Sequence, residues 1–156
     1  MIKKIALVAA ASAIAATTVW AGGHSSPEAQ AVNARQSHMQ LYAFNLGILG
    51  GMARGNAEYD ADAASAAAAN LAALAAMAQA AYWPMGTDNE SMEGTKALPA
   101  LWSDFAGAAK IGGDLAAASA SLAETAGDGL EALQAGMGPV GGACGACHRT
   151  YRQSDN

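Results

Sequence analysis

The stretch Gly138–Arg152 reads GPVGGACGACHRTYR and contains the two cysteines of this 156-residue chain. Cys144, Cys147 and His148 are spaced i, i+3 and i+4, so on an α-helix the three side chains leave from one face. C-x-x-C-H is the attachment motif of c-type haem. Two thiols one helical turn apart can bond to one edge of a porphyrin, and the adjacent histidine can ligate the iron. The motif therefore predicts one covalent haem c on a helix near the C-terminus.

Other chemistries of this motif compete with haem attachment. A disulfide between Cys144 and Cys147 would close a very small loop within a helix, strain the turn and leave His148 unexplained. A thioredoxin-like redox pair expects a βαβ context, which the sequence lacks. A zinc site needs three or four ligands, and His24 and His38 are the remaining histidines. Haem attachment is favoured, with zinc and a disulfide as the alternatives.

The N-terminus has the pattern of a secretory signal peptide. Lys3 and Lys4 precede an apolar run, 5–19, and Val19-Trp20-Ala21 is a small-x-small cleavage signal. An uncleaved N-terminal anchor is the alternative. We expect a cleaved signal peptide at 1–21, a mature domain at 22–156, a periplasmic location and no stable membrane span after cleavage. Export also favours haem, since bacteria attach c-type haem outside the cytoplasm.

The mature chain is acidic. It keeps six Lys and Arg residues against thirteen Asp and Glu residues, a net charge of −7. This charge disfavours nucleic acid and anionic membrane surfaces as partners. A cationic redox partner would suit it, although which redox proteins it meets is unknown from the sequence. Because no catalytic acid–base pair, nucleophile triad or phosphate loop is recognisable, we expect a protein that is not an enzyme.

Apolar residues recur at helical spacing, with abundant alanine and few Val or Ile residues. The pattern predicts helices from the Ser25–Glu28 segment to about Gly55, from Asp60 or Asp62 to about Tyr82, from Pro99 or Ser103 to before Gly127, and from Asp128 through the C-x-x-C-H motif. We expect Pro139 to kink or break the last helix. The segment 83–98 is rich in turn-forming residues and predicts an extended loop. Four helices with otherwise short links predict an all-α, antiparallel four-helix bundle.

The C-terminal segment resembles the haem-binding helix of class II cytochromes c, the cytochrome c′ family. ARQSHM at 34–39 and TKALPALWSDF at 95–105 are similar to further family stretches. The resemblance implies thioether bonds at Cys144 and Cys147, with His148 as the proximal iron ligand. It places Arg35 and Gln36 near the haem propionates and Arg152 near the proximal haem face. It also implies that a homodimer is possible.

Met39 stands where the family has its distal haem residue. It shares a helical face with Val32, Ala43 and Leu46, so we expect its side chain to point inward. An inward Met is often only core filler, but a thioether is also a soft iron ligand, and a Met/His pair raises the reduction potential. We favour a low-spin, one-electron carrier with His148 and Met39 as iron ligands. The alternatives are a high-spin, five-coordinate cytochrome c′ that binds nitric oxide or carbon monoxide, and a bundle without haem.

Overall fold

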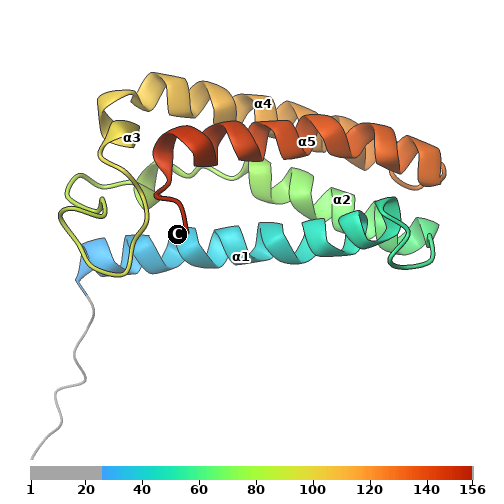
Figure 1. The fold of residues 1–156 in the computed structure, drawn as a ribbon, viewed down its shortest axis with the longest axis horizontal. Coiled ribbons are helices and arrows are strands. Elements are labelled where there is room, and N and C mark those ends of the chain that lie inside the picture. Colours follow the sequence, from blue (N-terminus) through green and yellow to red (C-terminus); the bar gives the residue numbers. More distant parts are fainter. Residues whose placement is uncertain (1–25, 156) are drawn as a thin grey trace, which may run out of the picture.

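The computed structural model describes residues 26–155, which form helices joined by turns and one long loop (Figure 1). The elements are α1 (Pro27–Ala53), α2 (Ala61–Ala76), the 3-10 helix η1 (Ala80–Tyr82), α3 (Ala100–Ser103), α4 (Phe105–Thr125) and α5 (Leu130–Tyr151). The four long helices run up and down along one axis, which confirms the predicted all-α four-helix bundle. The predicted signal peptide, 1–21, and the first residues of the predicted domain lie outside the described residues. Within 26–155, no helix is long and apolar enough to cross a membrane.

Short polar side chains begin three of the long helices. Ser26 caps α1 by accepting a hydrogen bond from the Ala29 N–H at 3.2 Å, Asp60 caps α2, and Asp104 caps α4. Each side chain satisfies a backbone N–H that has no partner inside its helix. These caps set the starting points of the helices close to where the sequence predicted them.

The structure differs from the predicted helices at the end of the second helix and in the absence of a break at Pro139. The second helix does not reach Tyr82, because Met77 adopts an extended backbone conformation and the chain then forms η1. The third long helix, α4, begins near the later of its two predicted starts, and Asp104 separates it from the short α3. Pro139 lies inside α5 without breaking it, since a proline removes a single backbone hydrogen bond.

The side-chain core occupies one half of the bundle. Its fully buried members come from all four long helices: Leu49, Leu71, Leu122, Leu133 and Val140. Glycine allows close contact between α4 and α5, since a Cβ on Gly136 would lie 2.6 Å from Cδ1 of Leu122. The other half of the bundle, which holds the end of α5 with the cysteine motif, surrounds a cavity instead.

Tyr59 joins the two turns at the core end of the bundle. Its hydroxyl donates to the Ala126 carbonyl at 2.9 Å and accepts from the Gly129 N–H at 3.0 Å. Gly129 has a φ of 140°, which L side chains rarely adopt. The tyrosine thus ties the α1–α2 turn to the α4–α5 turn.

The loop 83–98 returns to the end of α5 and holds it. The Leu98 N–H donates to the Tyr151 carbonyl at 2.9 Å, and the Gln153 N–H donates to the Lys96 carbonyl at 2.8 Å. The Tyr151 hydroxyl donates to Oδ2 of Asp104 at 2.6 Å. These contacts fasten the last turn of α5, which follows the cysteine motif, to the start of α4.

Replacing Tyr59 with Phe should lower the free energy of unfolding by about 1–2 kcal/mol, because two partly buried backbone groups lose their partner. Denaturant unfolding of the haem-loaded protein measures this loss. Tyr82→Phe is the matched control, since the Tyr82 hydroxyl makes no hydrogen bond within the described residues. Equal stability of the two variants would contradict the bridging role.

The Tyr151–Asp104 hydrogen bond predicts a pH dependence of stability. The bond raises the pKa of Tyr151 to about 12 and, with the Gly107 N–H, lowers the pKa of Asp104. The contribution of the tyrosine to the free energy of unfolding is therefore fully present below the ordinary tyrosine pKa of about 10. It is lost as the pH rises through about 12. The aspartate contribution is lost as the pH falls below the ordinary pKa of a carboxyl.

Melting curves of the wild type and Tyr151→Phe should differ by a constant amount at neutral pH. The difference should shrink above pH 10, where the hydrogen-bonded tyrosine loses its advantage. A difference that stays constant to pH 12 would show that the hydrogen bond does not cause it.

Candidate functional site

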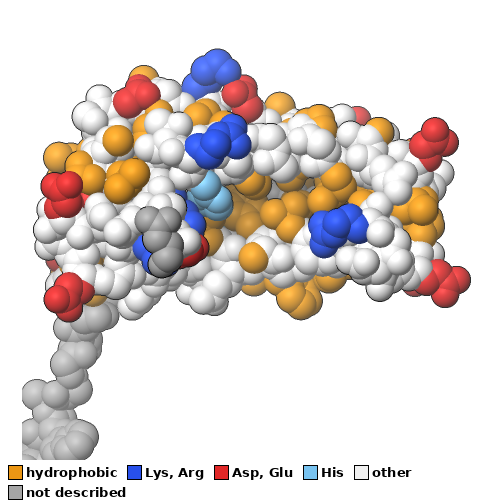
Figure 2. Space-filling view, viewed as in Figure 1, with side chains coloured by type: hydrophobic (Ala, Val, Ile, Leu, Met, Phe, Trp, Pro, Cys, Tyr) orange, Lys and Arg blue, Asp and Glu red, His pale blue; other side chains and the backbone are white. Residues whose placement is uncertain are grey.

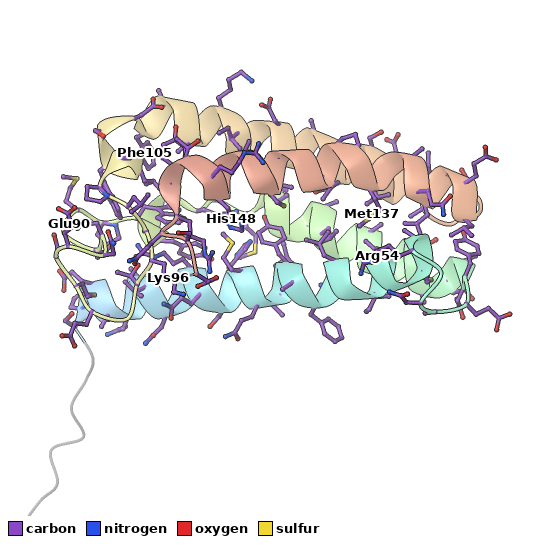
Figure 3. The ribbon with its side chains drawn as sticks, in the orientation of Figure 1. Arg54, Glu90, Lys96, Phe105, Met137 and His148 are labelled. Atoms are coloured by element: carbon purple, nitrogen blue, oxygen red, sulfur yellow. The ribbon has the colours of Figure 1, made fainter. Side chains whose placement is uncertain are left out.

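Cys144, Cys147 and His148 lie together on one wall of a cavity of about 440 Å³. They occupy the last two turns of α5, and the helix is continuous through them, so the i, i+3, i+4 spacing places all three on one face. Figure 3 shows His148 on α5, facing α1, with the sulfur atoms beside it. The two cysteines form no disulfide with each other.

The other walls come from every remaining helix and are almost entirely apolar. Small residues leave the space, and larger apolar residues close its ends. The lining comprises Met39, Tyr42, Ala43, Leu46, Ala75, Met77, Gln79, Ala80, Trp83, Leu101, Phe105, Ala108, Ala109, Ile111, Gly112, Leu115 and Ala143, besides the three motif residues. A concave, apolar site with a few convergent polar groups is the usual form of a cofactor pocket.

The environment keeps the motif residues uncharged. Burial raises the pKa of the Cys144 thiol, and burial together with the neighbouring Cys144 raises that of Cys147. Burial, and then the charge of Arg152, lower the pKa of His148. A neutral imidazole retains the nitrogen lone pair that a metal ligand needs.

Two methionines reach this cavity. Met39, from the middle of α1, lies on the wall as the helical pattern predicted, and its side chain is 38 % exposed. Met77 reaches it because α2 ends at Ala76 and the backbone turns there. The sequence did not single out Met77, because only the observed end of α2 brings it to the site. Met52 of α1 is buried in the core at 3 % exposure and does not line the cavity.

The polar side chains nearest the cavity are few. Gln79 donates to the Tyr42 hydroxyl at 3.4 Å, so one weak hydrogen bond links the two lining residues. Burial raises the pKa of Tyr42. His38 lies behind them, 4.8 Å from the Tyr42 ring and 5.7 Å from the Tyr82 ring, and is buried. Tyr82 belongs to η1, so this short helix helps to cover His38.

Arg35 is buried beside the cavity and organises the loop 83–98. One of its terminal nitrogens donates to Oγ1 of Thr87 at 2.8 Å, and the other donates to Oγ1 of Thr95 at 2.5 Å. Its guanidinium lies 4.9 Å from the ring centre of Trp83, which lines the cavity. Burial lowers the pKa of Arg35, and Asp88 opposes this shift.

Gln36 and Arg152 hold neighbouring parts of the chain. Gln36 donates to the Gly94 carbonyl at 2.6 Å, which gives the loop a second attachment to α1. Arg152 forms an ion pair with Asp155 at 2.7 Å and lies beside His148 on the outer surface of α5. Neither residue lines the cavity.

The residues present fit a haem. Two thiols and a neutral imidazole converge on one wall, and apolar side chains form the rest, as an extended hydrophobic macrocycle requires. The zinc alternative finds no support here, since no three His, Cys, Asp or Glu side chains between residues 26 and 155 could hold a metal ion together.

Known proteins resemble this chain in sequence and in fold. The family model described as Cytochrome C′ matches residues 30–152. Cytochrome c-554 of Cereibacter sphaeroides is 43 % identical over 127 residues, which cover 80 % of this chain and 81 % of that protein. The solved cytochrome c′ from Rhodobacter spheriodes superposes with a TM-score of 0.80 and 35 % identity, over 82 % of this chain and 98 % of the other.

A third relative is a nitric oxide complex of a cytochrome c′ variant from Alcaligenes xylosoxidans. It is 34 % identical, with a TM-score of 0.70, and the match covers 81 % of this chain and 97 % of that protein. The family match spans nearly the whole described chain and includes the cysteine motif. The chain therefore belongs to the cytochrome c′ family of class II cytochromes c, and its cofactor is covalently bound haem c.

Proposed function

We propose that this protein is a periplasmic one-electron carrier in which His148 and Met39 would ligate the iron of one haem c. The haem supplies a one-electron couple between ferric and ferrous iron. The observation that supports this function best is that a thioether from α1 and the imidazole from α5 reach the same apolar cavity.

Cys144 and Cys147 would hold the cofactor by adding their S–H groups across two vinyl groups, so that two C–S bonds form and no atom is lost. Their raised pKa values keep both thiols protonated until this reaction. Because both sulfurs belong to one turn of α5, attachment would also set the direction of the adjacent His148 side chain.

The surrounding residues would orient the cofactor and exclude water. Apolar residues of α4 line one side of the cavity, which keeps the local dielectric low. Arg35 would act through Trp83 and the loop rather than by direct contact, and Gln36 would support the same loop. Arg152 would keep His148 neutral through its charge.

The second candidate is a five-coordinate protein that binds nitric oxide or carbon monoxide. It is favoured by the relative from Alcaligenes xylosoxidans, whose variant forms a nitric oxide complex. The partial exposure of Met39 also suits a side chain that lies beside a ligand pocket without binding iron. Both candidates belong to a family of electron-transfer and gas-binding haem proteins rather than of typical enzymes.

We also propose that two copies of the protein can form a homodimer. Leu41 and Phe44 are 52 % and 67 % exposed on α1, and together they offer apolar surface for a second copy. Solution scattering of the haem-loaded protein would report the oligomeric state.

The ferric absorption and EPR spectra of the matured protein test the iron ligation. We expect a low-spin spectrum with a thioether–iron charge-transfer band, because a methionine sulfur completes six-coordination. Met39→Leu should abolish the band and give a high-spin spectrum, since leucine keeps the side-chain volume but cannot ligate.

Met77→Leu is the matched control, because it removes the other thioether of the cavity. It should leave the spectrum unchanged. Loss of the band in Met77→Leu alone would reassign the ligand, and a high-spin wild type would favour the gas-binding candidate.

A further inference from the structure

The hydroxyl of Tyr42 is a buried hydrogen-bond donor on the cavity wall. Among residues 26–155, Tyr42 is the one tyrosine that lines the cavity, and its side chain is 5 % exposed. The hydroxyl oxygen accepts a hydrogen bond from Nε2 of Gln79 at 3.4 Å. No group in the described part of the chain accepts the hydroxyl proton. A buried donor without an acceptor is unfavourable, so this proton points to a partner that binds inside the cavity.

The side chain of Tyr42 leans back along α1 over the preceding turn. Its ring centre lies 4.8 Å from that of His38, which is four residues earlier. Aromatic side chains on a helix point toward its N-terminus, so residues three and four positions earlier are their neighbours. His38 packs against the ring from behind the cavity, whereas Met39, three residues earlier, lines the cavity itself. The hydroxyl is therefore directed to the part of the cavity that Met39 lines.

Gln79 restricts the direction of the donor. Its amide reaches Tyr42 from the start of η1, after the end of α2. Because this amide occupies a lone pair of the hydroxyl oxygen, the hydroxyl proton points away from Gln79. Burial raises the pKa of Tyr42, the hydrogen bond from Gln79 opposes this shift, and the charge of the Cys144 thiolate adds to it. The effect of Cys144, which lies on α5, supports a hydroxyl directed into the cavity.

Few side chains on the cavity wall could accept this proton. Figure 2 shows mostly hydrophobic side chains in the hollow between α1 and α5. Gln79 is itself a donor to Tyr42, and the three residues of the cysteine motif lie on α5, where we assign them to the haem. The thioether sulfurs of Met39 and Met77 remain. Met39 is the better acceptor, because it shares a helical face with Tyr42 at a separation of three residues.

The side chain of Met39 is free to turn toward the hydroxyl. It is 38 % exposed and has three rotatable bonds, so packing does not fix one conformation. No hydrogen bond joins it to Tyr42 in the structure of residues 26–155. Iron ligation would draw the sulfur into the cavity, toward the hydroxyl. A thioether sulfur has two lone pairs, so one can bind iron while the other accepts a weak hydrogen bond.

We propose that Tyr42 donates a hydrogen bond to the sulfur of Met39 in the haem-loaded protein, with Gln79 orienting the hydroxyl, and so raises the reduction potential of the iron. This inference rests on the proposed ligation of iron by Met39. Tyr42 is a positioning residue that acts through Met39. The hydrogen bond withdraws electron density from the sulfur, which then stabilises ferric iron less, and the ferrous state is favoured.

The reduction potential of haem-loaded Tyr42→Phe tests the donor. Phenylalanine keeps the ring against His38 and removes only the hydroxyl. The equilibrium constant for reduction should fall about threefold to tenfold, where tenfold corresponds to about 59 mV for a one-electron couple. Gln79→Leu should shift the potential in the same direction by a smaller amount, because the hydroxyl remains but is less well oriented.

Tyr82→Phe is the matched control for this measurement. Tyr82 packs on the same His38, with 5.7 Å between the ring centres, but does not line the cavity. Its substitution should leave the potential unchanged. Equal potentials of Tyr42→Phe and Tyr82→Phe would overturn the proposal.

Displacement of the sixth ligand by imidazole gives a second readout on the ferric protein. Without the hydrogen bond the sulfur of Met39 donates more strongly to iron, so Tyr42→Phe should bind imidazole about twofold to fivefold more weakly than the wild type. If Tyr42 only packed the cavity, its loss would loosen the site and imidazole would bind more tightly. That result would contradict the hydrogen bond.

Combined substitutions identify the acceptor. In a Met77→Leu background, Tyr42→Phe should shift the potential as it does in the wild type. In a Met39→Leu background the sulfur is absent, and Tyr42→Phe should no longer change the potential. A full shift with Met39→Leu, or loss of the shift with Met77→Leu, would show that the hydroxyl serves another acceptor.

This inference and the proposed function fail in different ways. A low-spin wild type whose band depends on Met39, but whose potential does not depend on Tyr42, would refute the hydrogen bond alone. A high-spin wild type would refute ligation by Met39, and the inference would fall with it.

Discussion

The helical register of the last two turns of α5 is the constraint on which the rest of the molecule depends. Cys144, Cys147 and His148 can bind the same haem only if a single unbroken helix presents them on the same side. That side must then face open space. The bundle provides the space by ending α2 early, by dividing α3 from α4 and by placing alanine and glycine where larger residues would fill the interior.

The two ends of the bundle consequently differ: one holds the apolar core and the other surrounds the cavity. At one end, leucines from all four long helices form a dense core, and Tyr59 ties the two turns together. At the other end, the loop 83–98 is held by Arg35 and Gln36 and in turn holds the end of α5. The site is therefore supported mainly by polar contacts of the loop, whereas the distant end combines apolar packing with the two hydrogen bonds of Tyr59.

Much of this arrangement could be predicted from local patterns. The common face of the cysteine motif, the start of α2 near Asp60 and the place of Met39 on the cavity wall all follow from spacing within a few residues. The features that escaped prediction depend on where distant segments meet. Met77 reaches the cavity only because α2 ends before its alanine-rich sequence does. Lys96 meets Asp155 only because the loop returns to the end of α5, and no local pattern encodes that return.

The division into two ends has a consequence for how stability responds to the cofactor. A group that binds reversibly stabilises a fold by an amount that depends on its free concentration, and dilution removes that contribution. A group joined to Cys144 and Cys147 through carbon–sulfur bonds would be present at a fixed ratio of one per chain. It would then behave as an interior side chain of the half that surrounds the cavity, and dilution of the protein would leave the melting temperature unchanged.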